Sequence, residues 1–272
     1  QIIEHLKNEQ PDIIGISAVV STSYEFTKKL SLEIKKVLPD TTIIMGGNMG
    51  ASAEIVLKKT GVDFICTGEG DKTTVDFVNR WLTAKTKSDY SDIEGIAFLD
   101  ENKNIVVTPY PAPIEAKDVY NIDWSVLEET GEMDFYFKEI EPILRGTSFN
   151  HDPRASEPQR KDKTAVTLVA SKGCVARCTF CHRWDKGIRY IPVPVIMERI
   201  DFFIKKYNTG FVVFGDENFG TDKKWLREFI SEIKKRDLIW RVTGMRVNCI
   251  SPEWVIKMKD AGCSLINMGM ES

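Results

Sequence analysis

Three cysteines lie close together in the chain, at positions 174, 178 and 181, with the spacing Cys-x-x-x-Cys-x-x-Cys. The whole sequence holds only six cysteines, so this grouping calls for a chemical reason. Structural zinc sites use four ligands, usually in two separated pairs. Three thiolates in one loop can instead hold three irons of a [4Fe–4S] cluster and leave the fourth iron open for a small molecule. A zinc site completed by His182 is the alternative that the spacing leaves open.

The composition is that of an ordinary globular protein. The chain has 272 residues, with 37 Lys and Arg against 40 Asp and Glu, which gives a formal net charge of −3. This near-neutral balance gives no electrostatic reason to expect nucleic acid or an anionic membrane as a partner. No apolar run is long enough to cross a bilayer, and no secretion signal precedes the first strand. We therefore expect a cytoplasmic protein whose clustered thiols bind metal rather than form disulfides.

The first part of the chain predicts a parallel α/β domain. Short apolar strands at 13–17, 42–45 and 62–66 alternate with amphipathic helices, and such repeats fold with right-handed crossovers. Ligands of these sheets bind at the carboxyl ends of the strands. A hairpin at 95–107 and a proline-rich stretch follow.

The second part predicts a βα partial barrel. Strands at 165–170, 211–214, 238–242 and 265–268 alternate with helices, and the cysteines follow the first strand. We assign the α/β domain to residues 1–130, a linker to 131–163 because its end is almost wholly polar, and the barrel to 164–272. The chain starts inside a helix and stops after a strand, so we expect a fragment of a longer protein.

Residues 173–181, which read GCVARCTFC, resemble the cysteine signature of the radical S-adenosylmethionine (SAM) superfamily. The resemblance implies that Cys174, Cys178 and Cys181 hold a [4Fe–4S] cluster whose open iron is chelated by the amino and carboxylate groups of SAM. One electron from the reduced cluster would then cleave the S–C5′ bond. The resulting 5′-deoxyadenosyl radical would abstract hydrogen from the substrate.

The same resemblance suggests SAM contacts after the later strands. Asp216 and Glu217 lie where the superfamily places polar groups that receive the SAM amino group, and an anionic pair suits an ammonium group. Arg246 resembles the contact to the SAM carboxylate, which a planar guanidinium matches. Glu271, followed by Ser272, resembles the contact to the ribose hydroxyls. Each could equally belong to a polar turn or an ion pair at the end of the barrel.

Three segments of the first domain resemble the cobalamin-binding domain that precedes one subgroup of radical SAM enzymes. They read PDIIGIS, IIMGGNMGA and VDFICTGEGD. Their order in front of the cysteine motif implies a class B radical SAM protein, the group that contains cobalamin-dependent methylases and the anaerobic magnesium-protoporphyrin monomethyl ester cyclase. The alternative is a Rossmann-like domain whose glycines only make tight turns.

Within this resemblance, Gly46 and Gly47 would let a flat macrocycle or a nucleotide tail approach the backbone with no Cβ in the way. Further expected contacts to the tail are Ser17, Ser21 and Thr22 by hydrogen bonds, and Gly68, Glu69 and Gly70 along its edge. The usual Asp-x-His-x-x-Gly motif is not found in the sequence, so no ligand for cobalt can be named.

The resemblance implies an enzyme with SAM, a [4Fe–4S] cluster and cobalamin as cofactors, which methylates an unactivated carbon of a small-molecule or natural-product substrate. In that reaction, methylcobalamin would give its methyl group to a substrate radical. The alternatives are a radical cyclisation or rearrangement without net methylation, and an iron–sulfur or cobalamin sensor without turnover. Flavodoxin or ferredoxin is the implied electron donor, and an exposed cluster implies an anaerobic setting.

Overall fold

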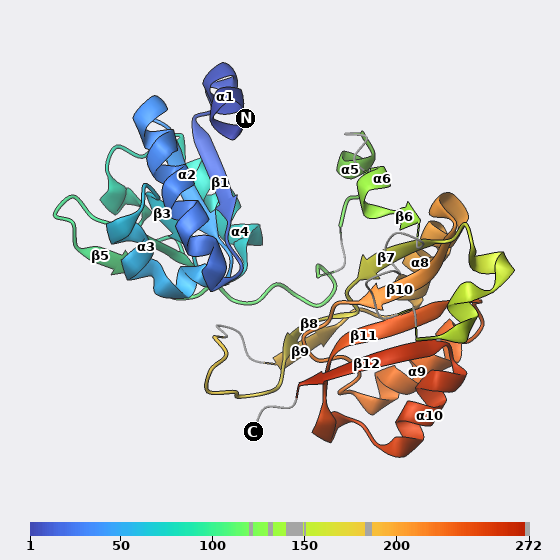
Figure 1. Cartoon of the computed structure of the whole chain (residues 1–272). Coiled ribbons are helices and arrows are strands. Elements are labelled where there is room, and N and C mark those ends of the chain that lie inside the picture. Colours follow the sequence, from blue (N-terminus) through green and yellow to red (C-terminus); the bar gives the residue numbers. More distant parts are fainter. Residues whose placement is uncertain (120–121, 130–132, 140–148, 150, 183–186, 270–272) are drawn as a thin grey trace. The chain divides into compact units, whose positions relative to one another are not determined.

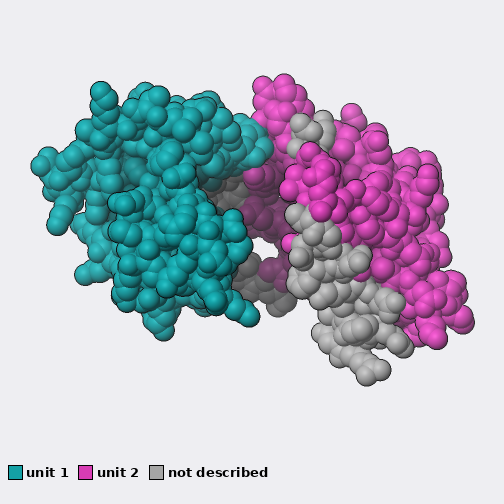
Figure 2. Space-filling model, turned by 90° about the horizontal axis from the view of Figure 1, so that it is seen from above, with its two compact units in different colours: residues 1–114, 177–185 teal, residues 115–176, 186–272 magenta. Residues whose placement is uncertain are grey.

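The computed structural model divides into two compact units, coloured separately in Figure 2. Unit 1 comprises residues 1–114 and 177–185, and unit 2 comprises residues 115–176 and 186–272. The structure describes the whole chain except residues 120–121, 130–132, 140–148, 150, 183–186 and 270–272.

Unit 1 is built on a five-stranded sheet with the order β1-β2-β3-β4-β5 (Figure 1). The first three strands are parallel: β1 (Ile13–Ser17) pairs with β2 (Thr42–Gly46), and β2 pairs with β3 (Phe64–Cys66). The hairpin of β4 (Ile96–Leu99) and β5 (Ile105–Val107) adds to β3 in antiparallel fashion. The sequence predicts a ligand at the carboxyl ends of parallel strands, and β1, β2 and β3 are the parallel strands of this sheet.

Alternating side chains of these strands enter two separate cores, as expected for a sheet covered on both faces. On one face Met45 and Ile65 are fully buried together with Ile34 of a helix. On the other, Phe64 packs against Phe77, with ring centroids 5.0 Å apart. The helices of the unit are α1 (Ile2–Glu9), α2 (Tyr24–Val37), α3 (Ala53–Lys59) and α4 (Gly70–Trp81), with short 3₁₀ turns η1 (Ser21–Ser23), η2 (Asn48–Ser52) and η3 (Lys87–Tyr90).

Unit 2 also has a five-stranded sheet, with the order β12-β11-β10-β7-β6. Four strands are parallel to one another, and β6 is antiparallel to β7. They are β6 (Lys138–Glu139), β7 (Thr164–Leu168), β10 (Thr209–Phe214), β11 (Ile239–Arg246) and β12 (Cys263–Gly269). The parallel strands of both sheets, joined by helices, confirm the predicted α/β class.

The helices between these strands cover one face of the sheet, where an aromatic core forms (Figure 1). Trp240 is fully buried there beside Phe229, with ring centroids 5.5 Å apart, and its indole N–H donates to the carbonyl of Ala261 at 2.8 Å. The described helices of the unit are α5 (Ser125–Glu129) and α6 (Met133–Tyr136), which precede β6, and α8 (Val193–Tyr207), α9 (Lys223–Ile233) and α10 (Pro252–Asp260), with 3₁₀ turns η4 (Pro153–Ser156), η5 (Pro158–Arg160) and η6 (Val247–Cys249). Among all described residues, no helix combines the length and apolar character that a membrane span needs.

The described part of the predicted linker, residues 131–163, packs into unit 2. β6 pairs with β7, and Phe149 is buried against Phe211 with ring centroids 5.0 Å apart. The buried side chain of Arg160 forms an ion pair with Asp237. Isolated apolar and charged residues therefore anchor this polar segment in unit 2, which begins at residue 115.

Gly46 and Gly47 offer a matched test of how β2 ends. Gly47 has a φ of 94°, and a Cβ there would overlap the carbonyl oxygen of Ala18, whereas a Cβ at Gly46 would meet nothing within 4 Å. We expect Gly47→Ala to lower the free energy of unfolding of unit 1 by roughly 2 kcal/mol. Gly46→Ala should change it by less than about 0.5 kcal/mol. Urea dependence of hydrogen exchange in unit 1 measures both, and equal stabilities would contradict this account.

Candidate functional site

The cysteine motif lies on a hairpin that the sequence patterns do not predict. β8 (Ser171–Cys174) pairs with β9 (Gly187–Tyr190) in antiparallel fashion, and Cys174 lies opposite Gly187. Beyond this pair, residues 175–182 form neither helix nor strand, apart from a turn in which the N–H of Cys181 donates to the carbonyl of Cys178 at 3.2 Å. We call β8, β9 and residues 175–182 the cysteine ribbon, and residues 170–171 with 190–191 its neck.

The three thiols of the ribbon are free and reachable from solvent. Cys174 and Cys178 are half-buried and Cys181 is exposed. In the described part of the chain, no three His, Cys, Asp or Glu side chains are close enough to hold a metal ion, so the thiols are not gathered in advance. Metal binding can itself order such a loop, and three free thiols are the donor set that a [4Fe–4S] cluster needs. Ligation by these cysteines stays a prediction.

Two of the three remaining cysteines are poor candidates for metal ligands. Cys66 and Cys263 are buried, and burial raises the pKa of both thiols, to about 12 for Cys263. A ligand must be a thiolate, so these two side chains favour packing over metal binding.

The two acidic residues after β10 have different environments. The carboxylate of Asp216 is 3% exposed. It accepts hydrogen bonds from the N–H of Ala170, 3.1 Å from each oxygen, and from the hydroxyl of Ser171. Glu217 is exposed. The superfamily resemblance assigns both residues to the SAM amino group, but in this structure Asp216 is buried and Glu217 is exposed.

Of the other predicted SAM contacts, the structure describes Arg246 but not Glu271. Arg246 is the last residue of β11, is half-buried, and lies opposite Gly269 of β12. Glu271 and Ser272 lie outside the described residues. Glu217, shortly after β10, and Arg246, at the end of β11, thus lie at the carboxyl ends of neighbouring parallel strands, where ligands of such sheets bind.

Unit 1 has a cleft of about 310 Å³ at the carboxyl ends of its parallel strands. It is lined by Ser17, Gly46, Gly47, Gly68 and Gly70, which the sequence predicts, and by Gly15, Ile16, Ile44, Cys66 and Thr74, which it does not. At Gly15 and Gly46 a Cβ would project into open space. The cleft floor is therefore bare backbone, which suits a flat ring or a nucleotide tail. A glycine inside a strand often marks the close approach of a ligand, and this signal could have added Gly15 to the predicted cleft residues.

Three other predicted contacts of unit 1 are not among the cleft residues. Ser21 and Thr22 are exposed on the 3₁₀ turn η1. The side chain of Glu69 is buried and accepts a hydrogen bond from the N–H of Ile114 at 2.7 Å. Glu69 therefore holds the proline-rich segment against unit 1, an interaction between residues distant in sequence that local patterns cannot reveal.

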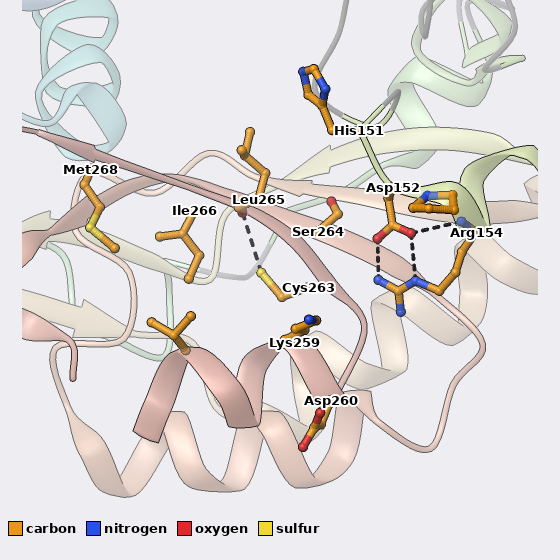
Figure 3. A pocket seen from close by; sticks show the side chains of 12 residues that line it. His151, Asp152, Arg154, Lys259, Asp260, Cys263, Ser264, Leu265, Ile266 and Met268 are labelled. Atoms are coloured by element: carbon orange, nitrogen blue, oxygen red, sulfur yellow. Dashed lines mark hydrogen bonds and ion pairs between the residues drawn. The ribbon is translucent and has the colours of Figure 1, made fainter. Parts of the chain in front are cut away.

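A larger pocket, of about 870 Å³, lies beside the edge strand β12 of unit 2 (Figure 3). Its most polar group is the ion pair of Arg154 and Asp152, whose charges satisfy each other through two contacts of 2.9 and 2.5 Å. The thiol of Cys263 faces the carbonyl of Leu265 at 3.5 Å and, with its raised pKa, stays protonated. We assign no reaction to this pocket.

Comparisons with known families agree with the two units. The family model of the B12 binding domain matches residues 1–78, and that of the radical SAM superfamily matches residues 168–272. These matches imply cobalamin, SAM and a [4Fe–4S] cluster as cofactors. They confirm the resemblances drawn from the glycine-rich segments and the cysteine motif.

Individual curated proteins match the chain over its whole length. The chain is 25% identical to the anaerobic magnesium-protoporphyrin IX monomethyl ester cyclase of Rubrivivax gelatinosus, over 100% of this chain and 46% of the relative. It is 22% identical to the cytidylyl-2-hydroxyethylphosphonate methyltransferase of Streptomyces wedmorensis, over 100% of this chain and 52% of the relative. The chain thus spans about half the length of these curated relatives.

A solved structure has the same fold. The cobalamin-dependent S-adenosylmethionine radical enzyme OxsB, with aqua-cobalamin bound, matches with a TM-score of 0.66 and 22% sequence identity. The match covers 100% of this chain and 37% of that one.

The burial of Asp216 predicts a pH dependence of stability. Burial raises the pKa of its carboxyl from 3.8 to about 6, so between these values the folded protein binds a proton that the unfolded chain has released. The stability from this group is therefore complete below about pH 4 and is lost as the pH rises through about 6. Relative to Asp216→Asn, which cannot ionise, the wild type should lose roughly 3 kcal/mol across this range. Urea unfolding followed by tryptophan fluorescence measures this, and parallel pH profiles would contradict it.

Proposed function

We propose that this chain, which joins a B12-binding domain to a domain of the radical SAM superfamily, belongs to an enzyme that carries out radical chemistry with SAM, a [4Fe–4S] cluster and cobalamin. The observation that carries the proposal is the pairing of two sites in one chain. Three free thiols lie in the cysteine ribbon, and a glycine-floored cleft lies at the carboxyl ends of the parallel strands of unit 1.

On this proposal the cysteine ribbon supplies three thiolates for three irons, through Cys174, Cys178 and Cys181. When bound, the cluster would supply the electron that cleaves SAM. Glu217 would hold the SAM amino group, because an exposed carboxylate can meet an ammonium group without a large desolvation cost. Arg246 would hold the SAM carboxylate through its planar guanidinium.

The cleft of unit 1 would receive the nucleotide tail of cobalamin. Gly15 and Gly46 leave its floor open, and the exposed hydroxyl of Ser17 can donate a hydrogen bond at its rim. Cobalamin would serve as the carrier of a methyl group that is transferred to a carbon of a small-molecule substrate. The relative from Streptomyces wedmorensis, named a methyltransferase, favours this version.

A second version uses the same cofactors for cyclisation or rearrangement without net methylation. The relative from Rubrivivax gelatinosus, which is named a cyclase, favours it. Methylation produces S-adenosylhomocysteine alongside 5′-deoxyadenosine, whereas the second version produces only 5′-deoxyadenosine. A sensor without turnover would bind cobalamin and leave SAM intact. A flavodoxin or ferredoxin as electron donor and an anaerobic cytoplasmic setting complete the proposal.

Removal of the three thiols tests the cluster. After anaerobic reconstitution with iron and sulfide, the wild type should hold about four irons per chain and cleave SAM when reduced. The triple variant with alanine at positions 174, 178 and 181 should lose both, because no ligands remain. Cys249→Ala, which alters a half-buried cysteine outside the ribbon, is the control. Iron analysis, visible absorption and chromatography of 5′-deoxyadenosine give the result. A triple variant that keeps the cluster would contradict the proposal.

A graded series at Gly46 tests the cleft. Gly46→Val places a branched side chain in the open floor and should weaken hydroxocobalamin binding at least about tenfold, which corresponds to about 1.4 kcal/mol. Gly46→Ala should have a smaller effect. Equilibrium dialysis measures the affinity, and circular dichroism checks that both variants are folded. Folded Gly46→Val with wild-type affinity would show that cobalamin binds elsewhere.

A further inference from the structure

We infer that Asp216 is a positioning residue that clamps the neck of the cysteine ribbon and does not contact the SAM amino group, which leaves that contact to the exposed Glu217. The inference rests on the proposed function, because it assigns separate tasks to two neighbouring acids of that site. It also departs from the equal assignment of both acids that the sequence suggests.

The first support is the set of hydrogen bonds at the neck. The N–H of Ala170 donates to both oxygens of Asp216 at 3.1 Å, and the hydroxyl of Ser171 donates to one of them. Ala170 also accepts through its carbonyl from the N–H of Ile191 at 2.9 Å, on the other side of the neck. Asp216 therefore holds the point at which both strands of the ribbon leave the body of unit 2, and Cys174 lies three residues beyond Ser171.

The second support is burial. The side chain of Asp216 is 3% exposed, so a ligand would have to displace the neck before it reached the carboxylate. Breaking these bonds would leave a buried N–H and a buried hydroxyl without partners, at a cost in free energy. Glu217, one residue later, is exposed.

The third support is the close packing of the Asp216 backbone on β11. A Cβ at Gly244 would overlap the carbonyl oxygen of Asp216, and the N–H of Phe219 donates to the carbonyl of Gly244 at 2.8 Å. Arg246 lies two residues further along the same strand. Asp216 thus ties the ribbon neck to the strand that carries the guanidinium proposed for the SAM carboxylate.

The opposite strand of the ribbon has anchors of its own. The hydroxyl of Tyr190 accepts from the N–H of Asp222 at 3.1 Å, and the indole N–H of Trp225 donates to the carbonyl of Ile191 at 2.8 Å. With these contacts β9 stays attached to α9 when Asp216 is changed. We therefore expect loss of the clamp to shift the ribbon and leave unit 2 folded.

Three variants distinguish a clamp from a direct contact to SAM. In Asp216→Asn, the amide oxygen can still accept from Ala170 and the amide N–H₂ can donate to the hydroxyl of Ser171, while the negative charge is lost. Asp216→Ala removes the clamp altogether. Glu217→Gln neutralises the exposed acid. Asp162→Ala, at an exposed aspartate of the same unit, is the matched control.

The readout is the SAM-dependent change in the electron paramagnetic resonance spectrum of the reduced, reconstituted full chain, titrated with SAM. Asp216→Ala and Glu217→Gln should each weaken apparent SAM binding about tenfold, whereas Asp216→Asn should weaken it less than about threefold. Iron content should match the wild type in every variant. Circular dichroism verifies the fold.

The possible results separate the inference from the proposed function. If Asp216→Asn weakens SAM binding as much as Asp216→Ala, the charge contacts SAM directly and the inference is overturned, while the proposed function stands. The same holds if Asp216→Ala binds SAM like the Asp162→Ala control. If the wild type gains no cluster, or if its spectrum does not respond to SAM, the proposed function fails and the inference fails with it.

Discussion

The hydrogen bonds of the buried Asp216 carboxylate are the interaction on which the candidate site of unit 2 depends. A ribbon of two short strands has little stability of its own. Its two backbone strands meet the rest of the unit at Ala170 and Ile191, and Asp216 accepts from the first of these residues. A buried carboxylate must be satisfied by several donors, so the neck can occupy few positions. The position of Cys174 follows from this restriction.

The same restriction gives two neighbouring acids different properties. Burial raises the pKa of the Asp216 carboxyl, and its hydrogen bonds lie within the unit. Glu217, one residue later, is exposed. Adjacent carboxyl groups with different environments are a common way for a site to separate positioning from binding, because environment rather than residue type decides which charge is available. The superfamily resemblance locates the pair, and only the tertiary contacts tell its members apart.

The sequence predicts those parts of this molecule that depend on residues near one another in the chain. Strands such as Ile13–Ser17 are continuous apolar runs between polar turns, and the motif of three cysteines is visible from spacing alone. The ribbon is missed because β8 reads SKGC and pairs only with its own hairpin partner, so it shows no apolar alternation. The hydrogen bond between Ile114 and Glu69 is missed because it joins residues 45 positions apart. In the polar segment before β7, burial depends on isolated residues such as Phe149, which no periodic pattern marks.

Glycines of the two units show why contact geometry, and not glycine content, points to a ligand. Gly47 and Gly244 lie where a Cβ would overlap a backbone carbonyl of the same chain, so the fold itself requires them. Gly15 and Gly46 meet nothing within 4 Å, and neither has the positive φ that excludes other residues. Packing of unit 1 therefore gives no reason for a glycine at these two positions, and each costs conformational entropy in a strand. A group outside the chain that rests on the bare backbone would supply the reason, and the cleft at the carboxyl ends of β1 and β2 is where such a group would lie.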